Sequence, residues 1–323
     1  MANPGTIGIL TSGGDAPGMN AAIRAVVRTA IDRGMRVVGI RRGYNGLLSK
    51  DAEELNLRTV SGIIHRGGTI LYTARCAEFN SPEGVKKAAA NCKEMGLCGL
   101  VVIGGDGSFR GARDLCLAGV PTVGIPGTID NDIGCSDYTI GFDTACNIGV
   151  EAVDRLRDTA QSHERCSVVE VMGRSAGHLA LHVGVATGAI SVIIPERGYR
   201  IEKVAEKIDR GHKTGKTHHI IIVSEGVPGG GIGVSEGISK LIDMEVRLTV
   251  LGHIQRGGSP TAIDRINATQ MGYRAAELME EGVGNRIVAL RNEQVVEVDI
   301  YEGLNMKKSI DDKLYTVEKV VSK

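Results

Sequence analysis

The chain has 323 residues, which is enough for two domains of ordinary size or for one large domain with a well-buried core. Lys plus Arg and Asp plus Glu both total 38, so the formal charge is zero and gives no global attraction to nucleic acid or to an anionic membrane. Aromatic residues make up only 3% and Trp is absent, which removes the stacking platforms that single-stranded nucleic acid binders use.

The seven cysteines indicate neither a disulfide framework nor a zinc site. They form no Cys-x-x-Cys pair and are scattered through ordinary helix and strand patterns, as is typical of a reducing compartment. The N-terminal residues show no basic segment followed by an apolar one, and no apolar run approaches the roughly 18 residues that a spanning helix needs. We therefore expect a soluble, cytoplasmic protein that binds neither nucleic acid nor membrane.

The first predicted unit is a strand, a Gly-rich loop and a helix. Residues 6–10 are apolar, residues 11–20 break the pattern, and residues 21–33 resume with small and apolar residues at helical spacing. Backbone N–H groups at such a loop and helix N-terminus can hold a phosphate. The loop has neither the Walker A spacing nor Gly-x-Gly-x-x-Gly, so the nucleotide folds that those fingerprints mark are not supported.

The same arrangement recurs further along the chain. After a strand at 37–40, a turn at 42–46 and a helix at 83–93, the strand-like residues 97–103 lead into residues 104–108 and a helix from Phe109 onward. Asp106 lies in this loop, where a carboxylate would repel a phosphate unless a divalent cation were bound. Asp106 is therefore a candidate metal ligand, and the alternative is a turn-forming Asp between glycines.

Residues 126–132 are the chemical centre that the pattern predicts. They follow the apolar run 120–125 and place Asp130 and Asp132 two residues apart beyond the end of a buried strand. In α/β proteins, ligands bind in the crevice beyond the carboxyl ends of the strands. Taken alone, the loop is explained equally well by an Asx turn or a helix cap.

Strands and helices alternate through the rest of the chain. The pattern predicts a helix at 145–158, a helix opened by 172–177 and a helix at 262–281, with strands at 167–171, 191–194, 220–223, 245–251, 287–290 and 295–298. His178 and His182 lie four residues apart, but no third ligand accompanies them, which favours packed or surface histidines. Residues 215–217 and 231–237 are nucleotide fingerprints with the wrong spacing. The order predicts a mostly parallel α/β architecture.

Five motifs in this order resemble the bacterial-type ATP-dependent 6-phosphofructokinase family. They are residues 11–24, 104–108, 126–132, 171–174 and 252–260. The resemblance implies two three-layer α/β/α, Rossmann-like domains with mostly parallel sheets. It implies an ATP-binding domain of residues 1–141 and 255–305, and a fructose 6-phosphate-binding domain of residues 142–254 and 306–323. The implied reaction, a committed step of glycolysis, transfers the γ-phosphoryl group of MgATP to the 1-hydroxyl of fructose 6-phosphate.

The resemblance also assigns roles to single residues. Asp130 matches the base that accepts the sugar hydroxyl proton, and Thr128 and Arg174 match groups that stabilise the transferring phosphoryl group. Asp106 matches the Mg²⁺ ligand, and Asp132 helps to organise the same site. The positions that match ATP contacts are Gly14, Arg75, Cys76, Gly105, Asp106, Gly107 and Ser108. Those that match fructose 6-phosphate contacts are Thr128, Asp130, Arg165, Met172, Gly173, Arg174, Glu225, Arg247, His253 and Arg256.

Family members assemble in a way that the resemblance extends to this chain. Arg165 and Arg247 match residues that reach in from a neighbouring subunit, which implies a homotetramer. Many bacterial members bind ADP or phosphoenolpyruvate as an effector between subunits, at positions matched here by Arg24, Arg28, Arg157, Gly188, Lys216 and His218. Gly62 and Ile190 stand at commonly acidic effector positions, and Thr214 stands at a commonly basic one. Because the acids are lost, we expect weak or absent activation by ADP.

Two glycines predict the phosphate donor. Pyrophosphate-dependent relatives carry Asp at the position of Gly107 and Lys at that of Gly127, so the glycines here favour ATP. The alternatives are a pyrophosphate-dependent enzyme, a catalytically silent sugar-phosphate-binding homologue and a nucleotide-dependent dehydrogenase. Intact Asp106, Thr128, Asp130 and Arg174 argue against the silent homologue, and the two failed fingerprints argue against the dehydrogenase.

Overall fold

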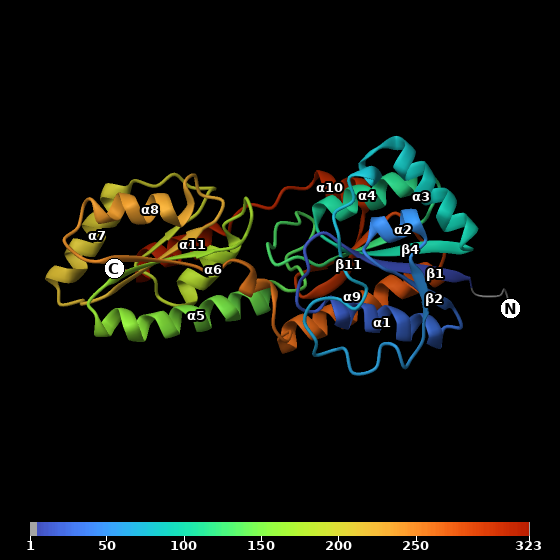
Figure 1. The fold of residues 1–323 in the computed structure, drawn as a ribbon, viewed down its shortest axis with the longest axis horizontal. Coiled ribbons are helices and arrows are strands. Elements are labelled where there is room, and N and C mark those ends of the chain that lie inside the picture. Colours follow the sequence, from blue (N-terminus) through green and yellow to red (C-terminus); the bar gives the residue numbers. More distant parts are fainter. Residues whose placement is uncertain (1–4, 323) are drawn as a thin grey trace. The chain divides into compact units, whose positions relative to one another are not determined.

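The computed structural model describes residues 5–322, which divide into two compact units. Unit 1 comprises the residues up to 143 together with residues 256–308, and unit 2 comprises residues 144–255 together with those from 309 onward. The chain therefore crosses between the units after residues 143, 255 and 308. Figure 1 shows each unit as a sheet with helices on both of its faces.

Unit 1 is built on a seven-stranded sheet in the order β11-β10-β5-β4-β1-β2-β3. Its five central strands are parallel, and the edge strands β3 and β11 run antiparallel to their neighbours. The strands are β1 (Thr6–Ser12), β2 (Arg36–Ile40), β3 (Ala52–Leu55), β4 (Leu97–Gly104), β5 (Thr122–Pro126), β10 (Arg286–Arg291) and β11 (Gln294–Asp299).

Helices cover both faces of this sheet. Helices α1 and α9 lie side by side on one face, while α2, α3, α4 and α10 cover the other (Figure 1). The helices are α1 (Met19–Asp32), α2 (Tyr44–Ser49), α3 (Pro82–Glu94), α4 (Asp106–Leu117), α9 (Ala262–Glu280) and α10 (Ile300–Asn305), with a 3₁₀ turn, η1, at Glu78–Asn80. Because both faces are covered, the central strands read as continuous apolar runs.

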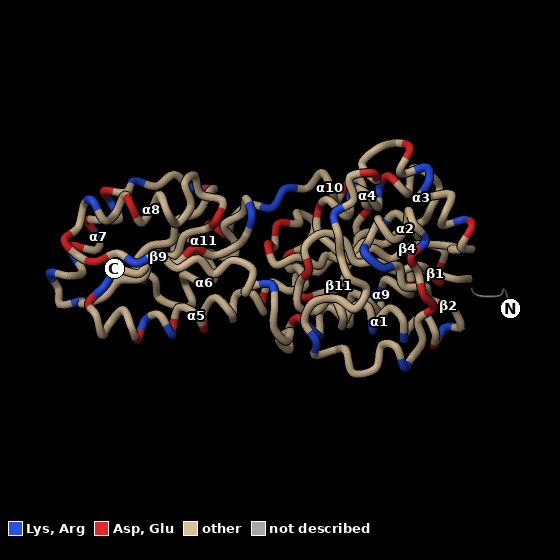
Figure 2. Tube along the Cα trace, in the orientation of Figure 1, with Lys and Arg blue, Asp and Glu red and all other residues tan. Residues whose placement is uncertain are grey.

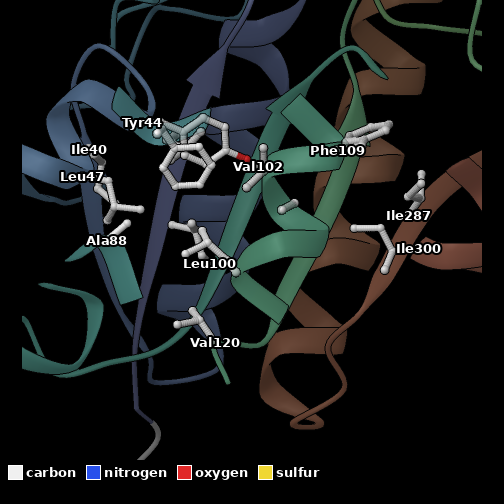
Figure 3. Packing of buried hydrophobic residues seen from close by; sticks show 14 of the residues in the cluster. Ile40, Tyr44, Leu47, Ala88, Leu100, Val102, Phe109, Val120, Ile287 and Ile300 are labelled. Atoms are coloured by element: carbon white, nitrogen blue, oxygen red, sulfur yellow. The ribbon is translucent and has the colours of Figure 1, made fainter. Parts of the chain in front are cut away.

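The core beneath α2, α3, α4 and α10 shows how these elements pack. Leu100 and Val102 point from β4 toward Tyr44, Leu47 and Ala88 of the helices (Figure 3). Tyr44 stacks on Phe79 with ring centroids 3.9 Å apart, and its hydroxyl donates to the carbonyl oxygen of Ser108 at 2.6 Å. The buried phenol thus satisfies its polar end while it fixes the first turn of α4.

Unit 2 is built on a four-stranded parallel sheet in the order β7-β8-β6-β9. One apolar cluster packs α5, α6 and α11 on one face, and a second packs α7 and α8 on the other, so unit 2 also has three layers. The strands are β6 (Cys166–Val171), β7 (Ser191–Ile193), β8 (His219–Ser224) and β9 (Val246–Val250). The helices are α5 (Phe142–Ser162), α6 (His178–Ala186), α7 (Ile201–Lys213), α8 (Gly230–Ser239) and α11 (Asp312–Val321), with the 3₁₀ turn η2 at Gly252–Arg256.

Several local predictions from the sequence need correction. The helix expected from Phe109 already begins at Asp106, since an acid in the first turn suits the positive end of the helix dipole. The predicted turn at 42–46 runs into α2, which starts at Tyr44, whereas residues 172–177 precede α6 and do not form its first turn. Residues 231–237 lie inside α8, so they cannot form a strand-to-helix nucleotide loop.

The charged residues of both signs are spread over the structure, as the formal charge of zero allows. Acidic and basic positions are interspersed along the elements of both units (Figure 2). Within residues 5–322, no helix combines the length and the apolar character needed to cross a membrane.

Candidate active site

In unit 1 the candidate site lies at the carboxyl ends of β1, β4 and β5. The chain leaves β1 through α1 and leaves β4 through α4, and these helices cover opposite faces of the sheet. Ser12 at the end of β1 is in register with Gly104 of β4, and Gly104 is in register with Pro126 of β5. The three predicted motif loops therefore start beside one another at a topological switch point, where open α/β sheets bind ligands.

Two other segments hold the loop that follows β1. Arg256 donates through Nη1 to the carbonyl oxygen of Asp15 at 3.1 Å. Its guanidinium lies so close to Gly14 that a Cβ atom there would be 2.5 Å from Nη1. Thr73 donates through its hydroxyl to the carbonyl oxygen of Gly13 at 2.6 Å, which brings the segment that ends in Arg75 and Cys76 to the same loop.

The second loop is the start of α4. Asp106 lies in its first turn with a side chain 40% exposed, and its Oδ2 accepts from Arg110 Nε at 2.8 Å. Ser108 is buried, and its hydroxyl donates to the carbonyl oxygen of Ser12 at 3.0 Å, so it ties α4 to the end of β1. Gly107 is exposed, and a Cβ atom there would meet no heavy atom within 4 Å.

The third loop carries Thr128 and Asp130, which are only 8% and 6% exposed. Thr139 donates to the carbonyl oxygen of Thr128 at 2.6 Å, and the Thr128 hydroxyl accepts from the N–H of Asp130 at 3.2 Å. A side chain that accepts from the backbone two residues on forms a local turn. The carboxyl group of Asp130 is thus presented by a tightly hydrogen-bonded backbone.

Gly127 has surroundings that the sequence did not predict. A Cβ atom at this position would lie 3.0 Å from Ile103 Cγ2 and 3.2 Å from Met19 Cε. A side chain at 127 would therefore start among apolar groups, and Ile103 and Met19 would have to shift slightly to make room for its Cβ atom.

Lys308 is a residue of this loop region that the sequence analysis missed. Its ammonium group donates to Asn131 Oδ1 at 2.7 Å and to the carbonyl oxygens of Ser136 and Asp137 at 2.8 and 3.0 Å. Burial lowers the pKa of Lys308 to about 8, while the charges of Asp137 and Asp132 act in the opposite direction. No spacing pattern could have indicated it, since its acceptors are more than 170 residues away in the sequence.

In unit 2 the loop after β6 carries Met172, Gly173 and Arg174. Glu225, which follows β8, is hydrogen-bonded to this loop. Oε1 of Glu225 accepts from the N–H groups of Gly173 and Arg174 at 3.2 and 2.6 Å. Gln255, fully buried and also missed from the sequence, accepts from the N–H of Met172 at 2.8 Å. Gly173 and Arg174 have φ values of 135° and 57°, so this loop is held in a conformation that the two side-chain acceptors stabilise.

Arg165 and Arg247 form a separate group in unit 2. Both are ion-paired with Glu245, one on each carboxylate oxygen, and the strand pairing places Arg247 opposite Ser167. The Arg247 side chain is 63% exposed. His253 lies in η2 and is exposed.

The predicted effector residues divide between the units. Arg24 and Arg28 lie on α1 in unit 1, while Arg157, Gly188, Lys216 and His218 belong to unit 2. Burial, followed by the charges of Arg157 and Lys216, lowers the pKa of His218, so these three side chains lie near one another. Ile190 is buried in the core beneath α7 and α8.

The two histidines of α6 lie one helical turn apart. His178 is buried, and Nδ1 of His182 lies 2.8 Å from the carbonyl oxygen of His178 within the helix. Across residues 5–322, no group of three or more His, Cys, Asp or Glu side chains is arranged to hold a metal ion by itself.

Known proteins resemble the chain along almost its whole length. The family model described as "Phosphofructokinase" matches residues 6–279. The chain is 54% identical over 317 residues to the ATP-dependent 6-phosphofructokinase of Clostridium novyi (strain NT), which covers 98% of this chain and 99% of that protein. It is 53% identical over 318 residues to the protein of the same name from Clostridium botulinum (strain Loch Maree / Type A3), with 98% and 99% covered.

Solved structures agree with these relatives. The phosphofructokinase from Saccharomyces cerevisiae matches with a TM-score of 0.89 at 34% identity, over 98% of this chain and 48% of that chain. The chain thus spans about half the length of the yeast protein. A pyrophosphate-dependent phosphofructokinase from Marinobacter aquaeolei matches with a TM-score of 0.85 at 21% identity, over 95% of this chain and 86% of that chain, which shows a shared fold.

Proposed function

This chain belongs to the phosphofructokinase family, and on that premise we propose that it transfers the γ-phosphoryl group of MgATP to the 1-hydroxyl of fructose 6-phosphate. The products are fructose 1,6-bisphosphate and ADP. The observation that carries the proposal is the meeting of three strand ends in unit 1, where β1 and β4 lead to the loops with Gly14 and Asp106 and β5 leads to the buried Asp130.

Asp130 is the proposed base. Phosphoryl transfer has a loose transition state with little covalent chemistry for the protein to perform, so positioning of the attacking hydroxyl matters most. The bonds among Thr128, Thr139 and the Asp130 N–H hold the backbone that carries this carboxyl group in place before substrate binds. Asp130 then accepts the proton of the 1-hydroxyl as that oxygen attacks phosphorus, and the β-phosphate oxygen leaves with ADP.

Thr128, Arg174 and Asp132 complete the proposed phosphoryl-transfer groups. The Thr128 hydroxyl is a neutral hydrogen-bonding group two residues before the base, and the guanidinium of Arg174 supplies positive charge. Charge develops on the equatorial oxygens of the transferring group, so both would bind the transition state more strongly than the ground state. Asp132 is half-buried in the same loop and supports the metal site.

Asp106 is the proposed magnesium ligand, and its surroundings fit that ion. Mg²⁺ usually keeps several waters and binds through one or two carboxylates together with substrate phosphates. A single part-exposed carboxylate in the first turn of α4 suits such a nucleotide-borne ion better than a closed protein site. When bound, Mg²⁺ neutralises charge on the phosphates. Asp106 would exchange its ion pair with Arg110 for this ligand.

The remaining proposed contacts to ATP lie in unit 1, and most of those to the sugar phosphate lie in unit 2. The proposed ATP contacts are Gly14, Arg75, Cys76, Gly105, Gly107 and Ser108. Ser108 acts chiefly by fixing the loop, because its hydroxyl already donates a hydrogen bond to the carbonyl oxygen of Ser12. For the sugar phosphate we propose Met172, Gly173, Arg174, Glu225 and His253 in unit 2, and Arg256 in unit 1.

We extend the proposal to a homotetramer in which Arg165 and Arg247 serve the sugar-phosphate site of a neighbouring subunit. Glu245 holds both guanidinium groups together. Two adjacent guanidinium groups suit a phosphate dianion, since Arg binds phosphate oxygens in pairs. An exposed Arg247 remains accessible to such a ligand.

For the effector site we propose Arg24, Arg28, Arg157, Gly188, Lys216 and His218. The position that would supply an acid for a metal-bound nucleotide is Ile190, which packs into the core. Gly62 and Thr214 supply neither an acid nor a base. A bare phosphate compound such as phosphoenolpyruvate is therefore the better match, and MgADP should leave the fructose 6-phosphate saturation curve unshifted.

The experiment that tests this function compares donors. The rate of fructose 6-phosphate phosphorylation is measured with MgATP, MgGTP and pyrophosphate at equal concentrations. We expect turnover with MgATP to exceed that with pyrophosphate by at least tenfold. Faster turnover with pyrophosphate would reject the donor assignment, and no turnover with any donor would favour a catalytically silent homologue.

A further inference from the structure

The far side of the loop that carries Asp130 is anchored to β10. The Asp137 N–H donates to the carbonyl oxygen of Leu290 at 2.8 Å, and the Leu290 N–H donates to Ser136 Oγ at 3.0 Å. Arg291 Nε donates to the carbonyl oxygen of Cys135 at 3.0 Å. Residues 135–137 are thereby fixed to β10, one of the rigid strands of unit 1.

Asn131 is the residue through which this anchored side reaches the reactive side. It lies between Asp130 and Asp132, it is 5% exposed, and its φ of 51° is one that few residue types adopt. Its side-chain amide donates to the carbonyl oxygen of Asp137 at 3.4 Å, a long bond. That contact alone would hold the conformation weakly.

Lys308 closes the gap between the two sides. Its ammonium group bonds the carbonyl oxygens of Ser136 and Asp137 on the anchored side and Asn131 Oδ1 on the reactive side, all within 3.0 Å. A charged donor shared among three acceptors in a half-buried setting forms bonds stronger than neutral ones. The backbone of residues 306–307 packs on the loop as well, since a Cβ atom at Gly134 would lie 2.2 Å from the carbonyl oxygen of Met306.

We infer that Lys308 is a positioning residue that holds the Asp130 loop in its reactive geometry through Asn131. The inference rests on the proposed role of Asp130 as base. Lys308 is also the last residue of unit 1 before the chain passes into unit 2. The same ammonium group therefore links a chain crossing to the loop that carries the base.

The test uses the full-length protein and four single variants. Lys308→Met keeps an unbranched side chain and removes the donors, Lys308→Arg keeps donors, and Asn131→Gly removes the acceptor while tolerating the positive φ. The exposed neighbour Lys307→Met is the matched control. For each variant, kcat, KM for MgATP, KM for fructose 6-phosphate and the urea unfolding midpoint are measured.

We expect Lys308→Met and Asn131→Gly each to lower kcat by about 10- to 100-fold, because misplacement of a reacting group by about 1 Å costs about that much. Both KM values should change by less than about threefold, and Lys308→Arg should recover most of kcat. The double variant that combines Lys308→Met with Asn131→Gly should have the same kcat as the slower single variant, because both changes remove the same hydrogen bond. Lys307→Met should equal the parent protein.

Three results would overturn the inference. The first is a kcat for folded Lys308→Met equal to that of Lys307→Met, even if its unfolding midpoint falls, because Lys308 would then only stabilise the fold. The second is additive losses in the double variant. The third result applies if Lys308→Met does not fold: a kcat for Asn131→Gly equal to that of the parent protein. An Asp130→Ser variant separates the two claims, since its full activity would contradict the proposed role of Asp130 as base, whatever the Lys308 variants show.

Discussion

At the scale of the residue, His219 makes stability depend on pH. It is 2% exposed at the start of β8, and neither ring nitrogen has a hydrogen-bond partner. Burial, followed by the charge of Lys216, lowers its pKa to about 4 from an ordinary value near 6.5. Between those two pH values the unfolded chain binds a proton that the folded chain does not, so stability falls as pH decreases.

This leads to a prediction about acid sensitivity. The free energy of unfolding should fall by about 2 kcal/mol from His219 alone between pH 7.5 and pH 5. Urea unfolding at both pH values measures the loss, and His219→Leu should abolish this part of it. An equal loss in both proteins would show that His219 is not the titrating group.

Gly107 gives a prediction about donor choice. An added side chain at Gly107 meets no protein atom within 4 Å, so Gly107→Asp should fold as the parent does. A carboxylate there would face the proposed phosphates, and like charges repel, so kcat/KM for MgATP should fall by at least about tenfold. Gly198→Asp, another open and exposed position, is the matched control. Equal kcat/KM values for the two variants would contradict the proposed ATP contact.

At the scale of the element, the contact between α1 and α9 depends on a missing side chain. A Cβ atom at Gly272 of α9 would lie 2.8 Å from both the carbonyl oxygen of Ala22 and the Cβ of Ala25. The helices can approach this closely only because position 272 has no side chain. In α8, by contrast, a Cβ atom at Gly233 would have only one neighbour, the Pro228 carbonyl oxygen at 4.0 Å.

The two glycines should therefore respond oppositely to the same change. Gly272→Ala should lower the free energy of unfolding by about 1–3 kcal/mol through overpacking. Gly233→Ala should raise it by about 0.5–1 kcal/mol, because Ala loses less backbone entropy in a helix. Urea titration of the two variants beside the parent decides the matter. Stabilisation by Gly272→Ala would mean that α1 and α9 are not held this closely.

The elements that the sequence predicted best are the buried strands. β6 and β8 were placed to within one residue at each end and β4 and β5 to within two, because a short apolar run bounded by polar or turn residues has few other uses. The edge strand β3 was missed because its glutamates face arginines of β2 and of the loop that follows it. α7 was also missed, although its buried residues Val204, Ala205 and Ile208 recur at helical spacing and form a clear apolar stripe.

At the scale of the whole molecule, the sequence did not predict the residues that hold a functional loop or side chain in place from another part of the chain. Lys308 holds a loop and Glu245 holds Arg165 far away in the chain, and no local spacing marks either contact. Gln255 lies within the motif 252–260, but nothing in that motif indicates its bond to the N–H of Met172. The motif residues were found because they recur in a fixed order, which the family resemblance recognised. The sequence did not predict that three of these motifs meet in unit 1, because that depends on β1, β4 and β5 being neighbours in the sheet.

The proposed tetramer makes a prediction about mixed subunits. Arg247→Ala and Asp130→Ser should each be nearly inactive alone, because each site would lack one group. In hybrids formed by joint refolding, a site with its own intact Asp130 can receive Arg247 from an Asp130→Ser neighbour. Activity of the mixture should exceed the sum of the separate variants severalfold. Strict additivity would show that Arg247 serves its own subunit.

The central claim is that Asp130 is the base for phosphoryl transfer to the sugar. Its most direct test is the single-turnover rate of Asp130→Ser with MgATP and saturating fructose 6-phosphate. We predict a rate about 10² to 10⁴ lower than that of the parent, which is the usual value of a positioned base. Sugar-phosphate binding and the unfolding midpoint should remain near those of the parent. A rate within about threefold of the parent in a folded variant that still binds the sugar would contradict the account.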